Sequence, residues 1–188
     1  MASPVLLQLT REAASCTACA LAATRSQVVF ASGDSSSDLV IVGEAPGAAE
    51  DLAGLPFVGR SGKLLEKLLL EELGLKREEV YITNLVKCRP PENRNPLPKE
   101  IAACKVFLDG QLEAIAPKVL LTLGNFATRS LLQTREGITS LRGRVFAFPG
   151  FSLIPTIHPA AALRGGQAKV DWMREDLAHV AAILGASS

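Results

Sequence analysis

Residues 39–59 read L-V-I-V-G-E-A-P-G-A-A-E-D-L-A-G-L-P-F-V-G, and this stretch decides the fold. Its first four residues are an apolar, partly β-branched run with the length of a buried parallel strand. The run ends at Gly43 in a turn of glycines and prolines that carries Glu44, Glu50 and the aromatic Phe57. In open α/β sheets, ligands bind at the carboxyl ends of strands, where such groups can hold a planar polar molecule. The alternative is an ordinary strand followed by a surface loop.

The composition is that of an ordinary globular protein. The chain has 188 residues, of which 48% are hydrophobic and 21% are charged, which suits one domain spanning 1–188. No apolar run approaches the roughly 20 residues that cross a bilayer. The first residues, M-A-S-P-V-L-L-Q-L-T, lack the basic segment and apolar core of a signal peptide. We therefore expect a cytoplasmic monomer without membrane contacts.

The distribution of charge is more informative than its total. The net charge of +1 argues neither for nor against a nucleic-acid partner. Residues 118–174, however, contain eight Lys or Arg and only two acids, a local excess of +6. This asymmetry fits a surface for a polyanion. The alternative is a solvated face whose charge is balanced by the acidic residues between positions 66 and 79.

Four cysteines indicate a metal centre. Without a secretion signal, disulfides are disfavoured. Cys16 and Cys19 form a C-x2-C pair, while Cys88 and Cys104 are far apart in the chain. Four thiolates suit a [4Fe–4S] cluster or a structural zinc, and the absence of a second C-x2-C pair favours the cluster. Such a cluster would tie the N-terminal segment to the proline-rich loop 88–98. Unrelated buried thiols are the alternative.

The order of the predicted elements indicates an α/β fold. Strand-like segments lie at 39–42, 80–84, 119–123, 143–148 and 152–157. Helix-like segments lie at 1–25, where residues 16–19 form a turn, and at 63–73, about 98–115, 125–133 and 170–184. Gly33–Ser37 and residues 159–167 read as turns. Alternation of strands and helices predicts a three-layer α/β/α sandwich around a central, mostly parallel, four-stranded sheet.

Polar residues follow three of the predicted strands. Glu44, Asn84 and His158 each stand at the end of one strand, so they should converge at one edge of the sheet. Asn84 can donate and accept in one plane, which suits the edge of an amide-like base. His158 can donate to an oxyanion, although a histidine after a strand is also a common structural residue.

These features together resemble the family 4 uracil-DNA glycosylases, the iron–sulfur branch of the uracil-DNA glycosylase superfamily. The resemblance covers roughly residues 16–184 and includes the four cysteines. Its motifs are G-E-A-P-G at 43–47, G-L-P-F-V-G-R-S-G at 54–62, Y-I-T-N-L-V-K-C-R-P-P at 81–91 and H-P-A-A-A-L-R at 158–164. Positions 48 and 49 are Ala, where the family pattern usually carries acids.

The resemblance implies a base-excision repair enzyme that flips deoxyuridine out of DNA. It places Gly43, Glu44, Ala45, Phe57, Asn84 and His158 around the uracil. Phe57 would stack on the base, and Asn84 would accept from N3–H and donate to O4. His158 would stabilise the uracil anion, and Glu44, or as a second choice Glu50, would act on water or on the sugar charge. No lysine in the motifs suits a Schiff base, so free uracil and an abasic site should be the products.

The resemblance also implies a DNA surface. Leu163 would fill the space left by the flipped base, and Arg164 would hold phosphate, both on the turn 159–167. The proline-rich loop would present Arg94 to the same partner. That partner is uracil-containing DNA, single- or double-stranded.

Three other readings compete with this one. An iron–sulfur DNA-binding or sensor module could use the same pocket without catalysis. A small-molecule hydrolase is disfavoured because no G-x-S-x-G or G-x-G-x-x-G motif follows the first strand. An electron-transfer protein would not explain the stretch from Glu44 to Phe57.

Overall fold

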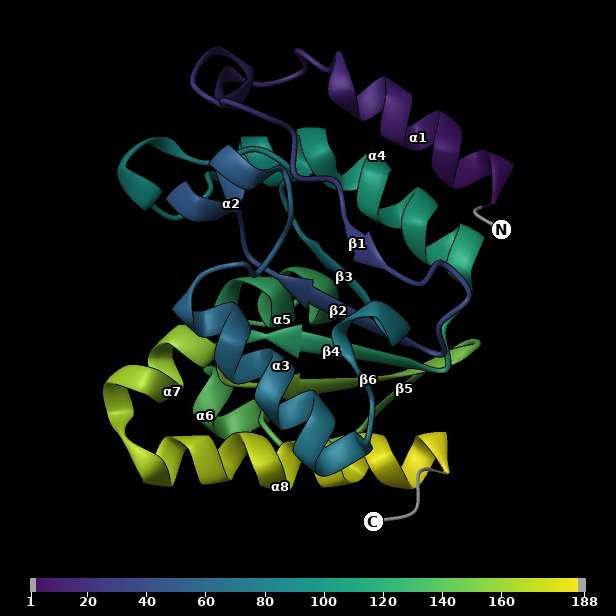
Figure 1. Ribbon diagram of the computed structural model, residues 1–188, viewed down its shortest axis with the longest axis vertical. Coiled ribbons are helices and arrows are strands. Elements are labelled where there is room, and N and C mark those ends of the chain that lie inside the picture. The colour runs from purple at the N-terminus through teal and green to yellow at the C-terminus, as the bar shows by residue number, and fades with distance from the viewer. Residues whose placement is uncertain (1–2, 186–188) are drawn as a thin grey trace.

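The sheet in the computed structural model, which describes residues 3–185, is built on four parallel strands. These are β3 (Tyr81–Asn84), β2 (Leu39–Gly43), β4 (Val119–Leu123) and β6 (Phe151–Thr156), in that spatial order. Two short antiparallel strands complete the edges, β1 (Ser32–Gly33) beside β3 and β5 (Phe146–Phe148) beside β6. The expected α/β/α class and the mostly parallel sheet are confirmed, but the sheet has six strands, not four (Figure 1). The expectation missed β1 because two residues of edge pairing leave no apolar pattern.

Helices cover both faces of the sheet (Figure 1). The helices along the chain are α1 (Pro4–Ala14), α2 (Ala48–Ala53), α3 (Arg60–Leu73), α4 (Pro98–Ile115), α5 (Gly124–Leu132), α6 (Ile138–Leu141), α7 (Pro159–Gly165) and α8 (Gln167–Leu184). Short 3-10 turns lie at η1 (Ala20–Ala23), η2 (Arg77–Glu79) and η3 (Pro91–Asn93). Within residues 3–185, none of the helices is both long and apolar enough to cross a membrane.

Alternation along each strand supplies two cores. In β2, Leu39 and Ile41 face one side and pack with leucines of α3 and with α8. Val40 and Val42 face the other side and pack with residues of α4 and α5. Because successive side chains of a strand point to opposite faces, a run that is apolar throughout must be covered on both. A third cluster joins α1, α4 and the segment that carries the cysteines.

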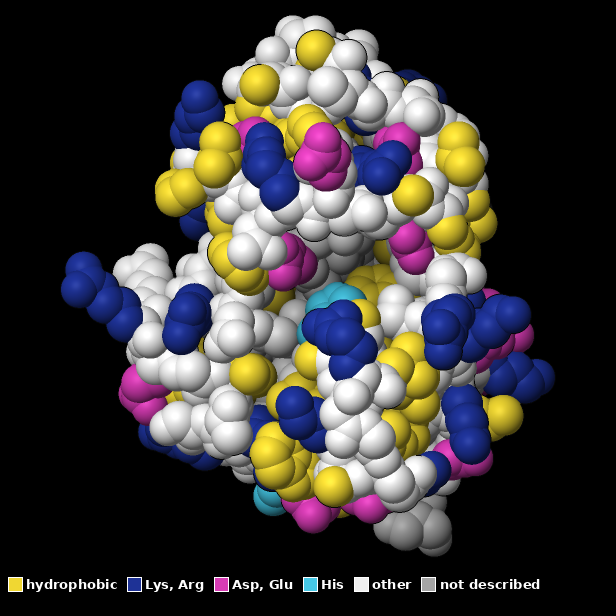
Figure 2. All heavy atoms as spheres, turned by 90° about the vertical axis from the view of Figure 1, so that its left-hand side faces the viewer, with side chains coloured by type: hydrophobic (Ala, Val, Ile, Leu, Met, Phe, Trp, Pro, Cys, Tyr) yellow, Lys and Arg dark blue, Asp and Glu magenta, His cyan; other side chains and the backbone are white. Residues whose placement is uncertain are grey.

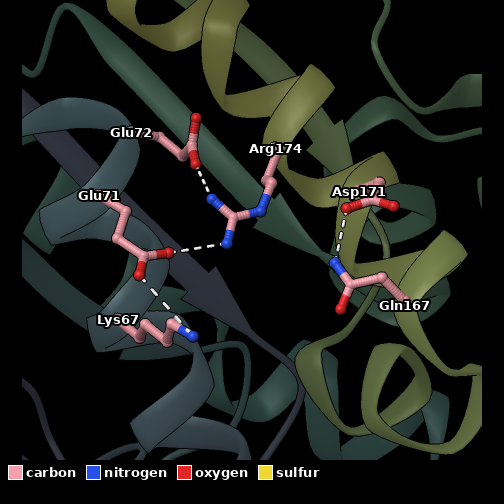
Figure 3. A network of polar contacts seen from close by, with 6 residues as sticks. All are labelled: Lys67, Glu71, Glu72, Gln167, Asp171 and Arg174. Atoms are coloured by element: carbon pink, nitrogen blue, oxygen red, sulfur yellow. Dashed lines mark hydrogen bonds and ion pairs between the residues drawn. The ribbon is translucent and has the colours of Figure 1, made fainter.

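The two helices on the first face are linked by charge as well as by apolar packing. Arg174 of α8 reaches across to α3, where it pairs with Glu72 and, at 2.7 Å, with Glu71 (Figure 3). Lys67 of α3 pairs with Glu71 at 3.7 Å. Since these side chains are partly exposed, the contacts fix how the helices meet more than they add to stability.

Two segments differ from the expectation. Within the described part of residues 1–25, α1 ends at Ala14, the cysteine pair lies in an irregular segment as expected, and only the short η1 follows, so the helical part is shorter than predicted. Residues 159–165 form helix α7, not a turn. Pro159 occupies the first helical position, alanines follow, and the His158 side chain accepts a hydrogen bond from the backbone of Ala160, which together start a helix.

Candidate active site

A cleft of about 760 Å³ lies along the carboxyl edge of the parallel strands. Its lining includes the loop after β2, the end of β3, the start of α5 and the start of α7. Figure 2 shows this face: a hollow crosses the middle of the molecule, a histidine lies within it, and basic side chains stand around it. The sheet order reverses direction at β2, between β3 and β4, which is where ligands bind in sheets of this kind.

The sheet register brings the predicted residues together. Gly43 and Asn84 are direct partners at the ends of β2 and β3. His158 follows β6 by two residues and lines the same cleft as Glu44 and Asn84. Gly43 lies beneath the cleft, and a Cβ there would come within 2.3 Å of Asn84 Oδ1 and 2.6 Å of the Phe57 ring. A side chain at position 43 would therefore displace both neighbours.

Asn84 lines the cleft and carries an unused hydrogen-bond acceptor. The residue is 1% exposed, and its Oδ1 atom has no hydrogen-bond partner among the described residues. Behind this side chain, the Lys87 amine donates to the backbone carbonyl of Asn84 at 2.7 Å. It also donates to Thr83 Oγ1 and to Gln111 Oε1, each at 2.6 Å. Because a buried acceptor without a partner costs roughly 1–3 kcal/mol, this atom is set up to accept from a bound molecule.

His158 is held as a neutral donor. Its Nδ1 accepts a hydrogen bond from the Ala160 backbone at 3.1 Å, which leaves the proton on Nε2. Burial, aided by the charge of Arg164, lowers the pKa of His158 to about 4, while Glu50 opposes that shift. The imidazole is thus neutral at pH 7 and can donate from Nε2 to an oxygen atom.

Phe57 lies against His158 in the cleft. The two rings are stacked, with centroids 5.7 Å apart and planes inclined by 29°. A base inserted between the two rings would need a ring-to-ring separation of about 7 Å, which is twice the usual contact distance. A base that stacks on Phe57 must therefore lie elsewhere on that ring.

The two glutamates of the loop after β2 differ in their surroundings. Glu44 is half-buried in the cleft lining, and burial raises the pKa of its carboxyl group. Glu50 also lines the cleft, but its carboxylate accepts hydrogen bonds from the backbones of Gly47, Val58 and Gly59, each at 3.1 Å. Glu50 therefore joins the start of α2 to the start of α3, whereas within residues 3–185 no backbone N–H group donates to the Glu44 carboxylate.

The expected DNA-contacting residues lie at the rim. Arg164 of α7 lines the cleft, and Leu163 beside it is 41% exposed. Arg94 also lines the cleft, but its guanidinium makes two hydrogen bonds, at 2.9 and 2.7 Å, with the buried carboxylate of Glu100. Much of the charge of Arg94 is thus neutralised within the protein.

The four cysteines line a second, smaller cavity between the irregular N-terminal segment and α4. Cys88 and Cys104 are buried, and Cys16 and Cys19 are partly exposed. Three N–H groups approach the sulfur atoms: Arg25 Nη1 lies 3.4 Å from Cys88, Lys87 N lies 3.3 Å from Cys104 and Ala18 N lies 3.5 Å from Cys16. Within residues 3–185, no three His, Cys, Asp or Glu side chains are close enough to hold one metal ion.

Burial raises the pKa of both inner thiols. For Cys88 the opposing influence is Arg25, and for Cys104 it is Lys87. The N–H groups directed at the sulfur atoms would stabilise the thiolate form of these cysteines. Thiolates are the form in which cysteines bind a metal or a cluster.

Four further residues support the two sites and were not predicted from the sequence. Lys87 is fully buried between the cysteine cavity and Asn84. Arg25 joins Cys88 to the Cys16 carbonyl. The buried Asp51 of α2 accepts from the Ser26 backbone at 2.9 and 3.1 Å, and Arg77 bonds the Phe57 carbonyl at 2.8 Å. The partners lie 9–63 residues away in sequence or act through backbone atoms, so no local pattern marks them.

Comparison with known proteins agrees with this geometry. Residues 30–181 match the Uracil DNA glycosylase superfamily. The chain is 48% identical to a type-4 uracil-DNA glycosylase of Thermotoga maritima over 151 residues, which is 79% of this chain and 78% of the relative. It is 45% identical to one from Saccharolobus solfataricus over 160 residues (81% and 74%), and 41% identical to one from Archaeoglobus fulgidus over 172 residues (87% and 86%). The chain belongs to the uracil-DNA glycosylase superfamily.

Proposed function

We propose that this protein is a uracil-DNA glycosylase that hydrolyses the N-glycosidic bond of deoxyuridine in DNA repair. The observation that carries the proposal is the buried, unpaired Oδ1 of Asn84 at the floor of the cleft, beside an aromatic ring and a neutral histidine. The names of the relatives agree with it, since they are type-4 uracil-DNA glycosylases.

Asn84 supplies selectivity for uracil. Its Oδ1 accepts from N3–H of uracil, and its amide group donates to O4. Cytosine presents an acceptor at N3 and a donor at N4, so both contacts would fail. A site built on such hydrogen bonds can reject the wrong partner by about 10⁴-fold. Phe57 stacks on the face of the base, and Gly43 and Ala45 leave room for it.

His158 and Glu44 support bond cleavage. As the bond between C1′ and N1 breaks, negative charge develops on the uracil and positive charge on the sugar. The Nε2–H of neutral His158 donates to the O2 atom of the base and stabilises the anion. The ionised Glu44 orients a water molecule or offsets the sugar charge. Glu50 shapes the loop, because its oxygens already accept three backbone N–H groups.

The products are free uracil and an abasic site. The Lys87 amine lies behind Asn84, buried and bonded to three oxygen atoms, so it is not available to attack C1′. We therefore propose a monofunctional enzyme that does not cut the strand. Arg164 and Leu163 at the rim contact the DNA around the flipped nucleotide, with a smaller contribution from Arg94. The strand preference, monomeric state and cytoplasmic location stay predictions.

The cysteine cavity holds a [4Fe–4S] cluster in this proposal. Cys16, Cys19, Cys88 and Cys104 supply the thiolates, and N–H donors from Arg25, Lys87 and Ala18 approach the sulfur atoms. The cluster would stabilise the fold by joining the N-terminal segment to α4 and to the proline-rich loop that follows β3. The residues of the cleft carry out the reaction.

The test is incubation with a 5′-labelled oligonucleotide that contains one deoxyuridine, followed by alkali and gel electrophoresis. Matched strands with thymidine or deoxycytidine at that position are the controls. We expect a cut only after alkali, only at uracil, with free uracil released in equal amount. Binding without uracil release, from protein that retains its folded circular-dichroism spectrum and its iron, would favour the non-catalytic DNA-binding module instead.

A further inference from the structure

The backbone of Phe57 is in an unusual conformation. Its φ angle is +53°, in the left-handed region that residues with bulky side chains rarely adopt. The side chain is 6% exposed and lies against His158 in the cleft. Because φ sets the direction in which the side chain leaves the backbone, the ring reaches this position only while the turn is held in that conformation.

Arg77 holds this turn from outside the cleft. Its Nη1 donates to the Phe57 carbonyl at 2.8 Å, and its Nη2 donates to the Pro56 carbonyl and, at 3.1 Å, to Ser32 Oγ. One planar guanidinium thus binds two successive carbonyl groups, those of Pro56 and Phe57, which flank the Cα atom of Phe57. Arg77 comes from η2, 20 residues farther along the chain, and Ser32 comes from the edge strand β1.

The turn also packs tightly against α3. Gly62 of α3 packs so closely that a Cβ there would lie 1.8 Å from the Phe57 carbonyl oxygen. The two residues after Phe57, Val58 and Gly59, donate their backbone N–H groups to Glu50. Arg77 therefore binds the carbonyl groups of the turn, and Glu50 binds the N–H groups of the residues that follow Phe57.

We infer that Arg77 is a positioning residue that sets the orientation of the Phe57 ring on the flipped base. It is not among the residues that line the cleft, so it acts on the base only through Phe57. A lysine could not replace it fully, because a single ammonium group does not bind two carbonyls in a fixed plane. The inference rests on the proposed glycosylase function and adds to it a residue that does not itself contact the base.

A double-mutant cycle separates positioning from a merely structural role. Arg77→Met, Phe57→Leu and the double variant are compared with the wild type in single-turnover uracil release and in inhibition by free uracil. We expect Arg77→Met to lower the release rate by roughly 10–100-fold and to weaken uracil inhibition. In the Phe57→Leu background the same change should alter both quantities by less than about 2-fold, because no ring is left to position.

Arg174→Met is the matched control. Arg174 also binds two acceptors with one guanidinium, but it joins α3 to α8 and does not line the cleft (Figure 3). We expect it to leave uracil release and uracil inhibition unchanged in both backgrounds.

Three outcomes are distinguishable. Equal losses from Arg77→Met in both backgrounds would overturn the inference and make Arg77 a general stabiliser of the fold. Absence of uracil release from the wild type would instead overturn the proposed function. If Arg77→Met does not fold, Arg77→Lys takes its place in the cycle, with an expected loss of about 3–10-fold that again vanishes with Phe57→Leu.

Discussion

Asn84 and Cys88 are only four residues apart, yet they line two different sites, the cleft and the cysteine cavity. The two sites differ in whether strand pairing or side-chain contacts position their residues. In the cleft, Gly43 and Asn84 end parallel strands in direct register, and His158 starts a helix just after a third. In the cavity, Cys16 and Cys19 lie on irregular backbone outside the sheet. Side chains such as Arg25 and Asp51 attach that segment to the rest of the protein.

This difference indicates that the cleft depends on the fold, whereas the cysteine site supports the fold. Backbone pairing positions the cleft residues, so a substitution there should remove chemistry and leave the fold intact. The cysteine segment has few backbone partners, so a substitution there should weaken the fold first. Substitutions at the two sites should therefore separate loss of chemistry from loss of stability.

Asn84→Asp should have the largest effect. At neutral pH a carboxylate cannot donate to O4 of uracil, so kcat/KM for uracil should fall by roughly 10³–10⁴-fold. The melting temperature should stay within a few degrees of the wild-type value. Single-turnover uracil release and circular dichroism measure the two quantities. An unchanged rate would remove Asn84 from base recognition.

His158→Ala should follow, with a loss of about 10²–10³-fold in the rate of the chemical step. DNA affinity should change much less, because the imidazole acts on charge that develops during cleavage. Fluorescence anisotropy with a non-cleavable deoxyuridine analogue measures the affinity. A loss of affinity as large as the loss of rate would make His158 structural.

Glu44→Gln should slow cleavage by about 10²-fold and remove the acid limb of the pH profile. Because burial raises the pKa of Glu44 above its usual 4.5, the wild-type rate should fall as the pH drops through that raised value. Protonation of His158, with its pKa of about 4, comes at lower pH and does not account for this limb. A Glu44→Gln variant with the wild-type acid limb would assign that limb to another group.

Cys88→Ala should reverse the pattern seen in the cleft. We expect a loss of about 2–3 kcal/mol in the free energy of unfolding, which lowers the melting temperature by roughly 5–10 °C, together with loss of bound iron. The activity that remains per folded molecule should stay within several-fold of the wild type. Iron analysis, thermal unfolding and uracil release measure the three effects. A stable variant with full iron content would remove Cys88 from the ligand set.

The sequence predicts the cleft better than the cysteine cavity, because paired strands position the cleft residues and irregular backbone carries half of the cysteines. The apolar runs at 39–42 and 119–123 predict strands, and they form β2 and β4, which are covered on both faces. Once parallel strands are assigned, the convergence of Gly43, Asn84 and His158 at one edge follows. The family match begins at residue 30, after Cys16 and Cys19, so that half of the cysteine set rests on its C-x2-C spacing and on the cavity geometry.

Side-chain contacts over long sequence separations could not be predicted. Glu44 and Glu50 look alike in the sequence, and only the structure shows that Glu50 is already engaged by three backbone N–H groups. Arg77 reads as an ordinary residue of an acidic, exposed turn, yet its guanidinium binds carbonyl groups 20 and 21 residues away. Lys87 stands in an apolar run, and its buried bonds to Gln111 depend on how α4 packs on the sheet.

Arg174→Met should have the smallest effect and completes the contrast. Its pairs with Glu71 and Glu72 are partly exposed, and exposed ion pairs contribute about 0.2–1 kcal/mol each. The melting temperature should fall by no more than about 6 °C at low salt, and by less at 1 M salt, where the charges are screened. Uracil release should not change, since apolar packing of α3 and α8 against the sheet keeps the cleft in place. A drop in activity larger than the drop in stability would show that the α3–α8 face also controls the cleft, and that the sheet edge alone does not fix its geometry.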